Sequence, residues 1–204
     1  MNSVRLDEQL IYPSKVVCVG RNYVEHIKEL NNAIPDQMVV FNKPNSSVTS
    51  ILNSFHQETL HYETEICFMI KDGRYAAVGL GLDLTKREQQ SVLKKQGLPW
   101  ERAKAFDGSA VFSRFIPLEG IDIASLHLEL LINCVRVQAG GVEQMMFKPD
   151  VILQELNSYT TLFDGDIIMT GTPQGVGEVH RGDVFLGRLK SGDTTLIEIE
   201  WPAE

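Results

Sequence analysis

The sequence predicts an α+β fold that consists mainly of β-strands. Apolar or alternating segments of strand length outnumber segments with helical periodicity, and turn signals with glycine or proline recur between them. Strands and helices do not alternate regularly, so a βαβ winding is not expected. Because we find no repeats, low-complexity tracts or Ser/Pro-rich linkers, we predict one domain over residues 1–204, with residues 1–14 as an N-terminal lead-in.

The first half of the chain is predicted to contain four main strands. Residues 15–20 form an apolar run that ends in glycine, and residues 38–44 form a second run that ends at a proline. Residues 63–70 and 74–84 are predicted to pair as strands joined at the turn signal KDG. Residues 22–30 are predicted to form a short helix with Asn22 as its N-cap.

A longer helix is predicted over residues 85–97. Thr85 and Glu88 have the spacing of a capping box, in which each side chain bonds to the backbone N–H of the other residue. Lysines near the end of this segment, followed by Gly97, are typical of a helix C-terminus.

The second half is predicted to begin with an alternating strand over residues 126–137. One face of this strand would carry Leu126, Leu128, Leu130, Ile132 and Cys134. The glycines in residues 139–141 predict a hairpin into the segment that follows. The remaining elements are a helix over 148–162, a turn, strand and glycine-rich loop over 164–177, and a strand over 194–201.

Composition and charge narrow the class of protein. The chain has 43% hydrophobic and 23% charged residues, which is ordinary for a globular protein, and its net charge is −8. An acidic chain is a poor partner for nucleic acid or an anionic membrane surface, although a few local cations could hold a small anion. The chain starts without a basic and apolar leader, contains no membrane-length apolar run, and has three widely spaced cysteines. We therefore expect a cytoplasmic protein with reduced, buried thiols.

Two acidic residues precede the most apolar strand. Glu63 and Glu65 lie one residue apart, so a strand would point both carboxylates to the same face, where like charges repel. A solvated strand end would explain this pair without any function. Alternatively, a divalent cation between the carboxylates would make the arrangement favourable. Asp83, at the end of the next strand, is a candidate third ligand, although aspartate is also a common turn residue there.

Other residues could carry proton transfer or bind an anion. His26 and Glu29 are three residues apart and would share a helix face, so that the carboxylate could orient the imidazole as a general base. The alternative is an exposed surface pair. Lys104, between small and apolar residues, could bind a carboxylate or could be a surface lysine whose stem is buried. Thr172 lies in a glycine-rich loop that lacks the lysine of a phosphate-binding loop.

Six ordered segments resemble the fumarylacetoacetate hydrolase superfamily, over residues 15 to 185 or thereabouts. These segments read VGRNYVEHIKE, FNKP, ETEICFMI, GLDLTKREQQ, KAFDGSAVFSRFIP and GDIIMTGTPQGVG. The resemblance is greatest to the smaller members, which include acylpyruvate hydrolases, oxaloacetate decarboxylases and hydroxymuconate isomerases. It implies a mixed β-roll of the C-terminal-domain type with a few short helices, and a homodimer.

The resemblance also implies roles for individual residues. Metal ligands would be Glu63, Glu65 and Asp83, which hold Mg²⁺ in most members and Mn²⁺ or Ca²⁺ in some. Catalytic residues would be His26, Glu29 and Lys104. Residues that line the substrate pocket would be Arg21, Arg87, Gln90 and Thr172. The interval between Glu65 and Asp83 is shorter than in these relatives, which makes the position of Asp83 a question for the structure.

The function implied by this resemblance is cleavage of a C–C bond in a 2-oxo acid by hydrolysis, through a metal-stabilised enolate. Decarboxylation of oxaloacetate and isomerisation of a hydroxymuconate would use the same residues, so they remain alternatives. A non-catalytic metal- or metabolite-binding protein, or a structural β-domain, is a further alternative. The segment around His26 is expected to act as a lid, with Asn31 and Asn32 in its hinge.

Overall fold

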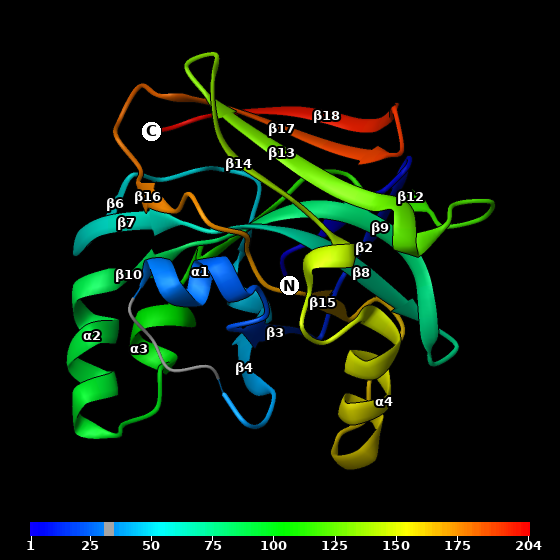
Figure 1. The fold of residues 1–204 in the computed structure, drawn as a ribbon, viewed down its shortest axis with the longest axis horizontal. Helices are drawn as coiled ribbons and strands as arrows, with labels where there is room; N and C mark the ends of the chain where they lie inside the picture. The colour runs from blue at the N-terminus through cyan, green and yellow to red at the C-terminus, as the bar shows by residue number, and fades with distance from the viewer. Residues whose placement is uncertain (31–34) are drawn as a thin grey trace.

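A mixed β-sheet forms the centre of the molecule (Figure 1) in a computed structural model that describes residues 1–30 and 35–204. Seven of its eight strands follow the order β4-β3-β15-β8-β9-β11-β5, and the eighth, β12, pairs with β9. These strands are β3 (Lys15–Gly20), β4 (Val39–Pro44), β5 (Val48–Thr49), β8 (Thr64–Lys71), β9 (Arg74–Asp83), β11 (Ala110–Phe112), β12 (Ile116–Pro117) and β15 (Ile167–Met169). Pairs β3–β15 and β5–β11 are parallel, whereas β8 and β9 form an antiparallel hairpin.

A second, antiparallel sheet packs over the central one (Figure 1, top). Its order is β14-β13-β17-β18, formed by β13 (Leu126–Ile132), β14 (Val135–Gly141), β17 (Val184–Ser191) and β18 (Thr194–Pro202). The main hydrophobic core lies between the sheets and includes Phe68 and Leu80 from the central sheet with Leu128 and Leu189 from the second. The prediction of a mainly β fold of the α+β class is confirmed.

Two small sheets complete the β-structure. One consists of β6 (Phe55–His56), β7 (Glu58–Tyr62), β10 (Thr85–Lys86) and β16 (Gly177–Glu178). The other is a hairpin of β1 (Val4–Leu6) and β2 (Gln9–Ile11), which lies within the segment expected to be a lead-in. This hairpin is attached to the domain, because the Phe115 N–H donates to the Arg5 carbonyl at 2.7 Å.

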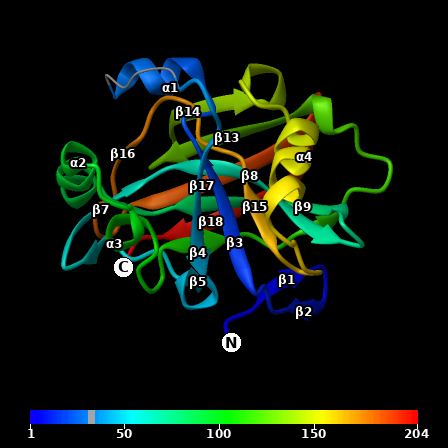
Figure 2. The ribbon, with the colours of Figure 1, turned by 90° about the horizontal axis from the view of Figure 1, so that it is seen from below.

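The helices lie on two sides of strands β3 and β4 (Figure 2). Helix α4 (Pro149–Tyr159) packs Ile152 and Leu156 against Val17, Val19 and Ile168. On the other side are α2 (Arg87–Gln96) and α3 (Glu101–Lys104), with α1 (Val24–Glu29) above them in Figure 1. Three short 3₁₀ turns are η1 (Asn45–Ser47), η2 (Ile123–Ser125) and η3 (Val142–Gln144).

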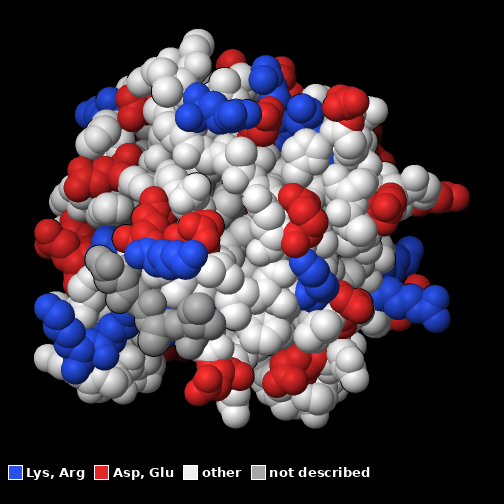
Figure 3. Space-filling model, in the orientation of Figure 1, with Lys and Arg blue, Asp and Glu red and all other residues white. Residues whose placement is uncertain are grey.

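Two further observations concern the whole chain. Within the described residues, every helix is too short or too polar to cross a bilayer. On the face drawn in Figure 3, acidic and basic side chains are interspersed.

The predicted turn of the β13–β14 hairpin is wrong. Instead of lying at residues 139–141, the turn lies at Asn133 and Cys134, which have positive φ angles of 49° and 69°. Cys134 is therefore exposed at the turn, contrary to the prediction that all three cysteines are buried, whereas Cys18 and Cys67 are buried as expected. The glycines at 139–141 belong to β14, and η3 follows in place of a second strand.

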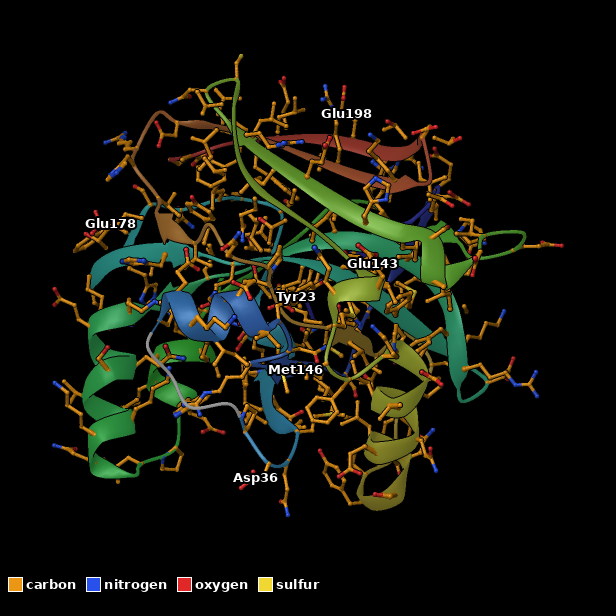
Figure 4. All side chains as sticks on the ribbon, in the orientation of Figure 1. Tyr23, Asp36, Glu143, Met146, Glu178 and Glu198 are labelled. Carbon is orange, nitrogen blue, oxygen red and sulfur yellow. The ribbon has the colours of Figure 1, made fainter. Side chains whose placement is uncertain are left out.

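Asn22 is not the N-cap of α1, because Tyr23 occupies that position. The buried Asn22 side chain instead donates to the carbonyls of Phe147 (3.0 Å) and Thr170 (2.8 Å), and accepts from the Phe147 N–H (2.7 Å). Figure 4 labels Tyr23, just before α1, and Met146 below it; the two segments meet here, because Tyr23 pairs with Met145 in an isolated β-bridge. Asn22 thus joins the end of β3 to two distant loops.

The predicted capping box at the start of α2 is also wrong. Thr85 lies in β10, Lys86 is the N-cap, and the cap makes no side-chain hydrogen bond. The Thr85 hydroxyl is buried and accepts from Lys104 Nζ at 2.6 Å. Gly97 does end α2 in the left-handed conformation, with φ of 66°.

Candidate active site

Three buried carboxylates meet at one end of the β8–β9 hairpin. Glu63 immediately precedes β8, Glu65 lies within it, and Asp83 ends β9. The antiparallel pairing sets Glu65 opposite Gly81, and the Asp83 N–H donates to the Glu63 carbonyl at 2.8 Å. One carboxylate oxygen of each acidic residue lies within 4.8 Å of those of the other two. The structure thus brings together the three predicted metal ligands.

The short interval between Glu65 and Asp83 leaves this arrangement intact. Lys71 pairs with Arg74 at the far end of the hairpin, across Asp72 and Gly73, whose φ angles are 49° and 69°. A two-residue turn of this kind fixes the register of the strands that it joins. The short interval is thus accommodated by a tight turn at Asp72 and Gly73, and the strand pairing still aligns the carboxylates at the opposite end of the hairpin.

Two lysines and an arginine contact the carboxylates. Lys104 Nζ donates to Glu63 Oε2 at 2.9 Å and to Asp83 Oδ2 at 2.6 Å. Lys43 Nζ lies 2.8 Å from the other Asp83 oxygen, Oδ1, and Arg87 Nη2 donates to Glu63 Oε1. Both lysine side chains are buried, so these ion pairs are shielded from solvent.

The electrostatic environments of the carboxylates differ. Burial would raise the pKa of Glu63, but the charges of Lys104 and Arg87 outweigh it and hold this pKa well below its usual range. Burial raises the pKa of Glu65 well above its usual range, and the negative charges of Asp83 and Glu63 add to the shift. Burial would lower the pKa of Lys104, but Asp83 and Glu63 raise it. A divalent cation would favour the ionised form of Glu65, which its neighbours disfavour.

This set of donor atoms fits a hard divalent cation. Mg²⁺ and Mn²⁺ prefer carboxylate oxygens, and the three acidic residues direct one oxygen each to the same small space. Asp83 Oδ1 lies 2.8 Å from Lys43 Nζ, and a carboxylate oxygen with one such partner still has a lone pair for a metal. Lys104 competes for two of the three carboxylates.

His26 and Glu29 form a hydrogen-bonded pair on α1. His26 Nδ1 lies 3.1 Å from Glu29 Oε2, and the other Glu29 oxygen accepts from the Gly175 N–H at 2.9 Å. Since Nδ1 faces the carboxylate, Nε2 is the ring nitrogen left for a substrate. Glu25 on the same helix instead accepts from Lys28 at 2.7 Å, on the exposed side. The predicted hinge residues 31 and 32 lie outside the described residues.

A narrow pocket lies between His26 and Glu63. Its cavity volume is about 30 Å³, room for one or two water molecules. Cavities of about 390 and 710 Å³ occur elsewhere, but neither is lined by the carboxylates or by the His26–Glu29 pair. The pocket is lined by Gly20, Arg21, His26, Leu30, Phe41, Glu63, Arg87, Gln90, Lys94, Trp100 and Lys104.

Cationic side chains dominate the walls of this pocket. Arg21 has a φ of 57°, a conformation uncommon for residues with a Cβ, and its guanidinium lies 5.9 Å from the Trp100 ring centroid. Burial lowers the pKa of Lys94 to about 8, and the positive charges of Arg87 and Arg21 contribute. Such walls favour a small ligand with more than one negative charge.

Two of the predicted pocket residues occupy different positions. Gln90 lines the pocket and accepts from Arg87 Nη1 at 2.9 Å. Thr172 does not line it; its hydroxyl accepts from Gln138 Nε2 at 2.9 Å, and Gln138 Oε1 accepts from the Thr64 N–H at 3.2 Å. Thr172 therefore contacts the framework behind β8, and its contact with substrate stays a prediction.

Sequence reasoning missed three residues of the site: Lys43, Trp100 and Gly175. Lys43 gave a signal, because it is a lysine within an apolar strand and within the FNKP segment. Gly175 lies in the glycine-rich loop, but its contact with α1 depends on how distant segments pack. Trp100 gave no local signal.

Comparison with known proteins identifies the family. A model of the fumarylacetoacetate hydrolase C-terminal domain matches residues 15–202. Oxaloacetate tautomerase YcgM of Escherichia coli is 38% identical over 192 residues, which cover 85% of this chain and 88% of that protein. The mitochondrial oxaloacetate decarboxylase of Dictyostelium discoideum is 36% identical over 199 residues, with coverage of 89% and 91%.

A solved structure shares the whole fold. Fumarylpyruvate hydrolase from Pseudomonas aeruginosa, in complex with Mn²⁺ and pyruvate, has a TM-score of 0.89 and 26% identity, and covers 99% of this chain and 95% of its own. The ordered motifs, the fold and the matches agree: this chain belongs to the fumarylacetoacetate hydrolase family.

Proposed function

We propose that this protein is a metal-dependent tautomerase of a small 2-oxo dicarboxylic acid such as oxaloacetate. The observation that carries this proposal is His26, which is hydrogen-bonded to Glu29 and lines a cationic pocket together with Glu63, one of the three clustered carboxylates. A simple binding site would need no oriented base. Relatives named oxaloacetate tautomerase, at 35–38% identity, support the same reaction.

The charge of the pocket supports a dianionic substrate. One carboxylate and the adjacent keto oxygen would lie toward the acidic residues and their metal. The second carboxylate would lie near Arg21 and Arg87, which line the same pocket. Since the cavity holds only one or two waters, substrate entry requires these side chains to move outward.

Proton transfer is assigned to His26. Its Nε2 takes a proton from the carbon between the keto group and the distal carboxylate, and the proton returns at the keto oxygen to give the enol; the reverse steps restore the ketone. Glu29 keeps Nδ1 protonated and stabilises the imidazolium that forms. The Gly175 N–H holds Glu29 in place from the other side.

Glu63, Glu65 and Asp83 would hold Mg²⁺ or Mn²⁺, with Ca²⁺ as a third option, and the bound metal would draw electrons from the keto group. Lys104 uses its three donors on Glu63, Asp83 and Thr85. It must release one of these bonds before it can donate to a substrate oxygen.

The test follows the ultraviolet absorbance of enol-oxaloacetate with Mg²⁺, with and without the protein. We expect the wild type to accelerate ketonisation, His26→Ala to lose this acceleration, and Glu65→Ala to lose every metal-dependent activity. No acceleration by the wild type would contradict the proposal, and so would full activity of Glu65→Ala.

Hydrolysis of an acylpyruvate is a second candidate, supported by the structural likeness to fumarylpyruvate hydrolase. In that reaction His26 would activate water against the second carbonyl. Release of pyruvate from acetylpyruvate or fumarylpyruvate would identify it. Release of CO₂ from oxaloacetate would instead identify decarboxylation, the activity named for the Dictyostelium relative.

A further inference from the structure

Lys43 is a fully buried cation that does not line the pocket. Its side chain is 0% exposed, and it projects from β4, next to β3. Its ammonium donates to the carbonyls of Lys104 and Ser109 and to the Ser109 hydroxyl, the last two at 3.0 and 3.1 Å. These bonds fix the segment that carries Lys104. Lys43 cannot touch a substrate, so any effect on the site must act through its neighbours.

The main anionic neighbour of Lys43 is Asp83. The Lys43 nitrogen lies 2.8 Å from Asp83 Oδ1, so the two side chains form a buried ion pair. Lys43 therefore stabilises the negative charge of Asp83 at Oδ1. Lys104 contacts the other oxygen, Oδ2, and also contacts Glu63.

The formal charges in this buried cluster cancel. Lys43, Lys104 and Arg87 contact Glu63 and Asp83, and none of them contacts Glu65. Their three positive charges balance the three carboxylates once Glu65 is also ionised as a metal ligand. A divalent metal would leave the cluster with two uncompensated positive charges, which is unfavourable away from water. A ligand that brings two negative charges would restore neutrality, and linkage requires that each then strengthens the binding of the other.

We propose that Lys43 is a positioning residue whose charge makes metal retention depend on a dianionic ligand. With Lys43 in place, the site holds a divalent cation weakly until a dicarboxylate arrives, and releases both readily after turnover. This inference rests on the proposed metal-dependent function and extends it to the order and coupling of binding.

The test compares two anions of the same shape and different charge. Oxalate carries two negative charges, whereas oxamate chelates in the same way with one. Mn²⁺ affinity is measured by titration calorimetry without an anion and with each anion, after correction for complexes in solution. In the wild type we expect oxalate to tighten Mn²⁺ binding roughly tenfold more than oxamate does, since one extra charge acts at close range.

Lys43→Gln removes the charge but keeps an amide that can donate to the same carbonyls. In this variant we expect Mn²⁺ alone to bind more tightly and the preference for oxalate over oxamate to fall to about twofold. Lys71→Gln, at the exposed turn of the β8–β9 hairpin that carries Asp83, is the control for loss of a lysine charge and should behave as wild type. If Lys43→Gln fails to fold, the wild-type comparison of the two anions still decides the charge argument.

Equal effects of oxalate and oxamate in the wild type would overturn the inference, and so would an undiminished oxalate preference in Lys43→Gln. Both results leave the proposed function standing, because Mn²⁺ still binds. Absence of Mn²⁺ binding under every condition would instead contradict the proposed function, and this inference with it.

Discussion

At the scale of single residues, the buried carboxylates fall into two kinds. Asp166 accepts from the backbone and hydroxyl of Ser14, from the backbone and ammonium of Lys15, and from the Phe163 N–H. Glu65 accepts from the Gly171 N–H at 2.7 Å and otherwise faces like charges. A buried carboxylate with ample donors serves stability, whereas one beside like charges is a candidate for function.

Asp166 should make stability depend on pH. Burial would raise its pKa, but hydrogen bonds from Lys15 and Ser14 bring the pKa below its ordinary value. A lowered folded-state pKa adds stability that is fully present above the unfolded pKa of about 4 and is lost as the pH falls through the folded value. Urea unfolding should show Asp166→Asn destabilised by about 2 kcal/mol at pH 7.

The difference in free energy of unfolding between wild type and Asp166→Asn should become smaller as the pH drops below about 4. Asp193→Asn, at an exposed turn, is the control and should match wild type throughout. If the difference in free energy of unfolding stays constant from pH 7 to pH 3, the charge of Asp166 does not contribute to stability.

Glu29 should act through its charge. Glu29→Gln can accept from the Gly175 N–H, but its NH2 group then faces His26 Nδ1, so it can neither keep Nδ1 protonated nor stabilise an imidazolium. We expect kcat for ketonisation to fall by roughly 10²-fold with little change in KM. Glu25→Gln, on the exposed side of the same helix, should leave kcat unchanged. Equal effects of the two substitutions would contradict the role of the pair.

At the scale of elements, the glycine-rich loop holds α1 over the pocket. Gly175 has a φ of 100°, and a Cβ there would lie 2.0 Å from the Val137 carbonyl oxygen. The backbone can approach β14 this closely only without a side chain, and this approach presents the N–H to Glu29.

Gly175→Ala should therefore reduce activity as well as stability. The loop must shift away from β14, and the contact with Glu29 is lost, so we expect kcat to fall at least tenfold, or about 1.4 kcal/mol in barrier. Gly182→Ala is a close control, because Gly182 has a φ of 90° with open space around it. Backbone strain should lower the Tm of Gly182→Ala, as it does for Gly175→Ala, but the kcat of Gly182→Ala should equal that of the wild type. If Gly175→Ala has the kcat of the wild type, the contact between the Gly175 N–H and Glu29 does not support activity.

The elements also show what the sequence can predict. Alternation and the KDG turn signal predicted the β8–β9 hairpin, because pairing follows from periodicity. The same pattern left a solvated strand end as an alternative for Glu63 and Glu65, and the family resemblance was needed to favour a metal site that includes Asp83. The glycines at 139–141 misled the turn prediction because their role is close packing: a Cβ on Gly140 would lie 2.6 Å from Pro173 Cβ. Lys43 and Trp100 depend on contacts between distant segments, which local patterns do not encode.

At the scale of the whole molecule, the site lies where the central sheet meets helices α1 to α3 and the small sheet formed by β6, β7, β10 and β16 (Figures 1 and 2). The carboxylates come from one hairpin, the base from α1, and the cations from β4, α2 and α3. No single element can assemble this site, so the unfolded chain should bind a divalent cation far more weakly than the folded protein. Metal binding and folding must then be linked.

This linkage predicts a thermal shift. A ligand at a hundred times its dissociation constant stabilises the folded state by about 2.7 kcal/mol. For a chain of this size, each kcal/mol raises Tm by about 2–4 °C. Melting in Mg²⁺ with oxalate, compared with EDTA, should therefore raise Tm by about 5–10 °C.

Glu65→Gln separates the metal site from the fold itself. The amide can still accept from the Gly171 N–H, but it removes a buried charge that Asp83 and Glu63 repel. In EDTA the variant should therefore melt at or above the wild-type Tm, and Mg²⁺ with oxalate should shift it by less than about 1 °C. A metal-dependent shift as large as that of the wild type would show that the cation binds elsewhere. A lower Tm in EDTA would show that the Glu65 carboxylate itself stabilises the fold. We expect the variant to be at least as stable as the wild type in EDTA and to show no rise in Tm with Mg²⁺ and oxalate. Together these two results would mean that the three carboxylates bind a cation and that Glu65 is not needed to stabilise the fold.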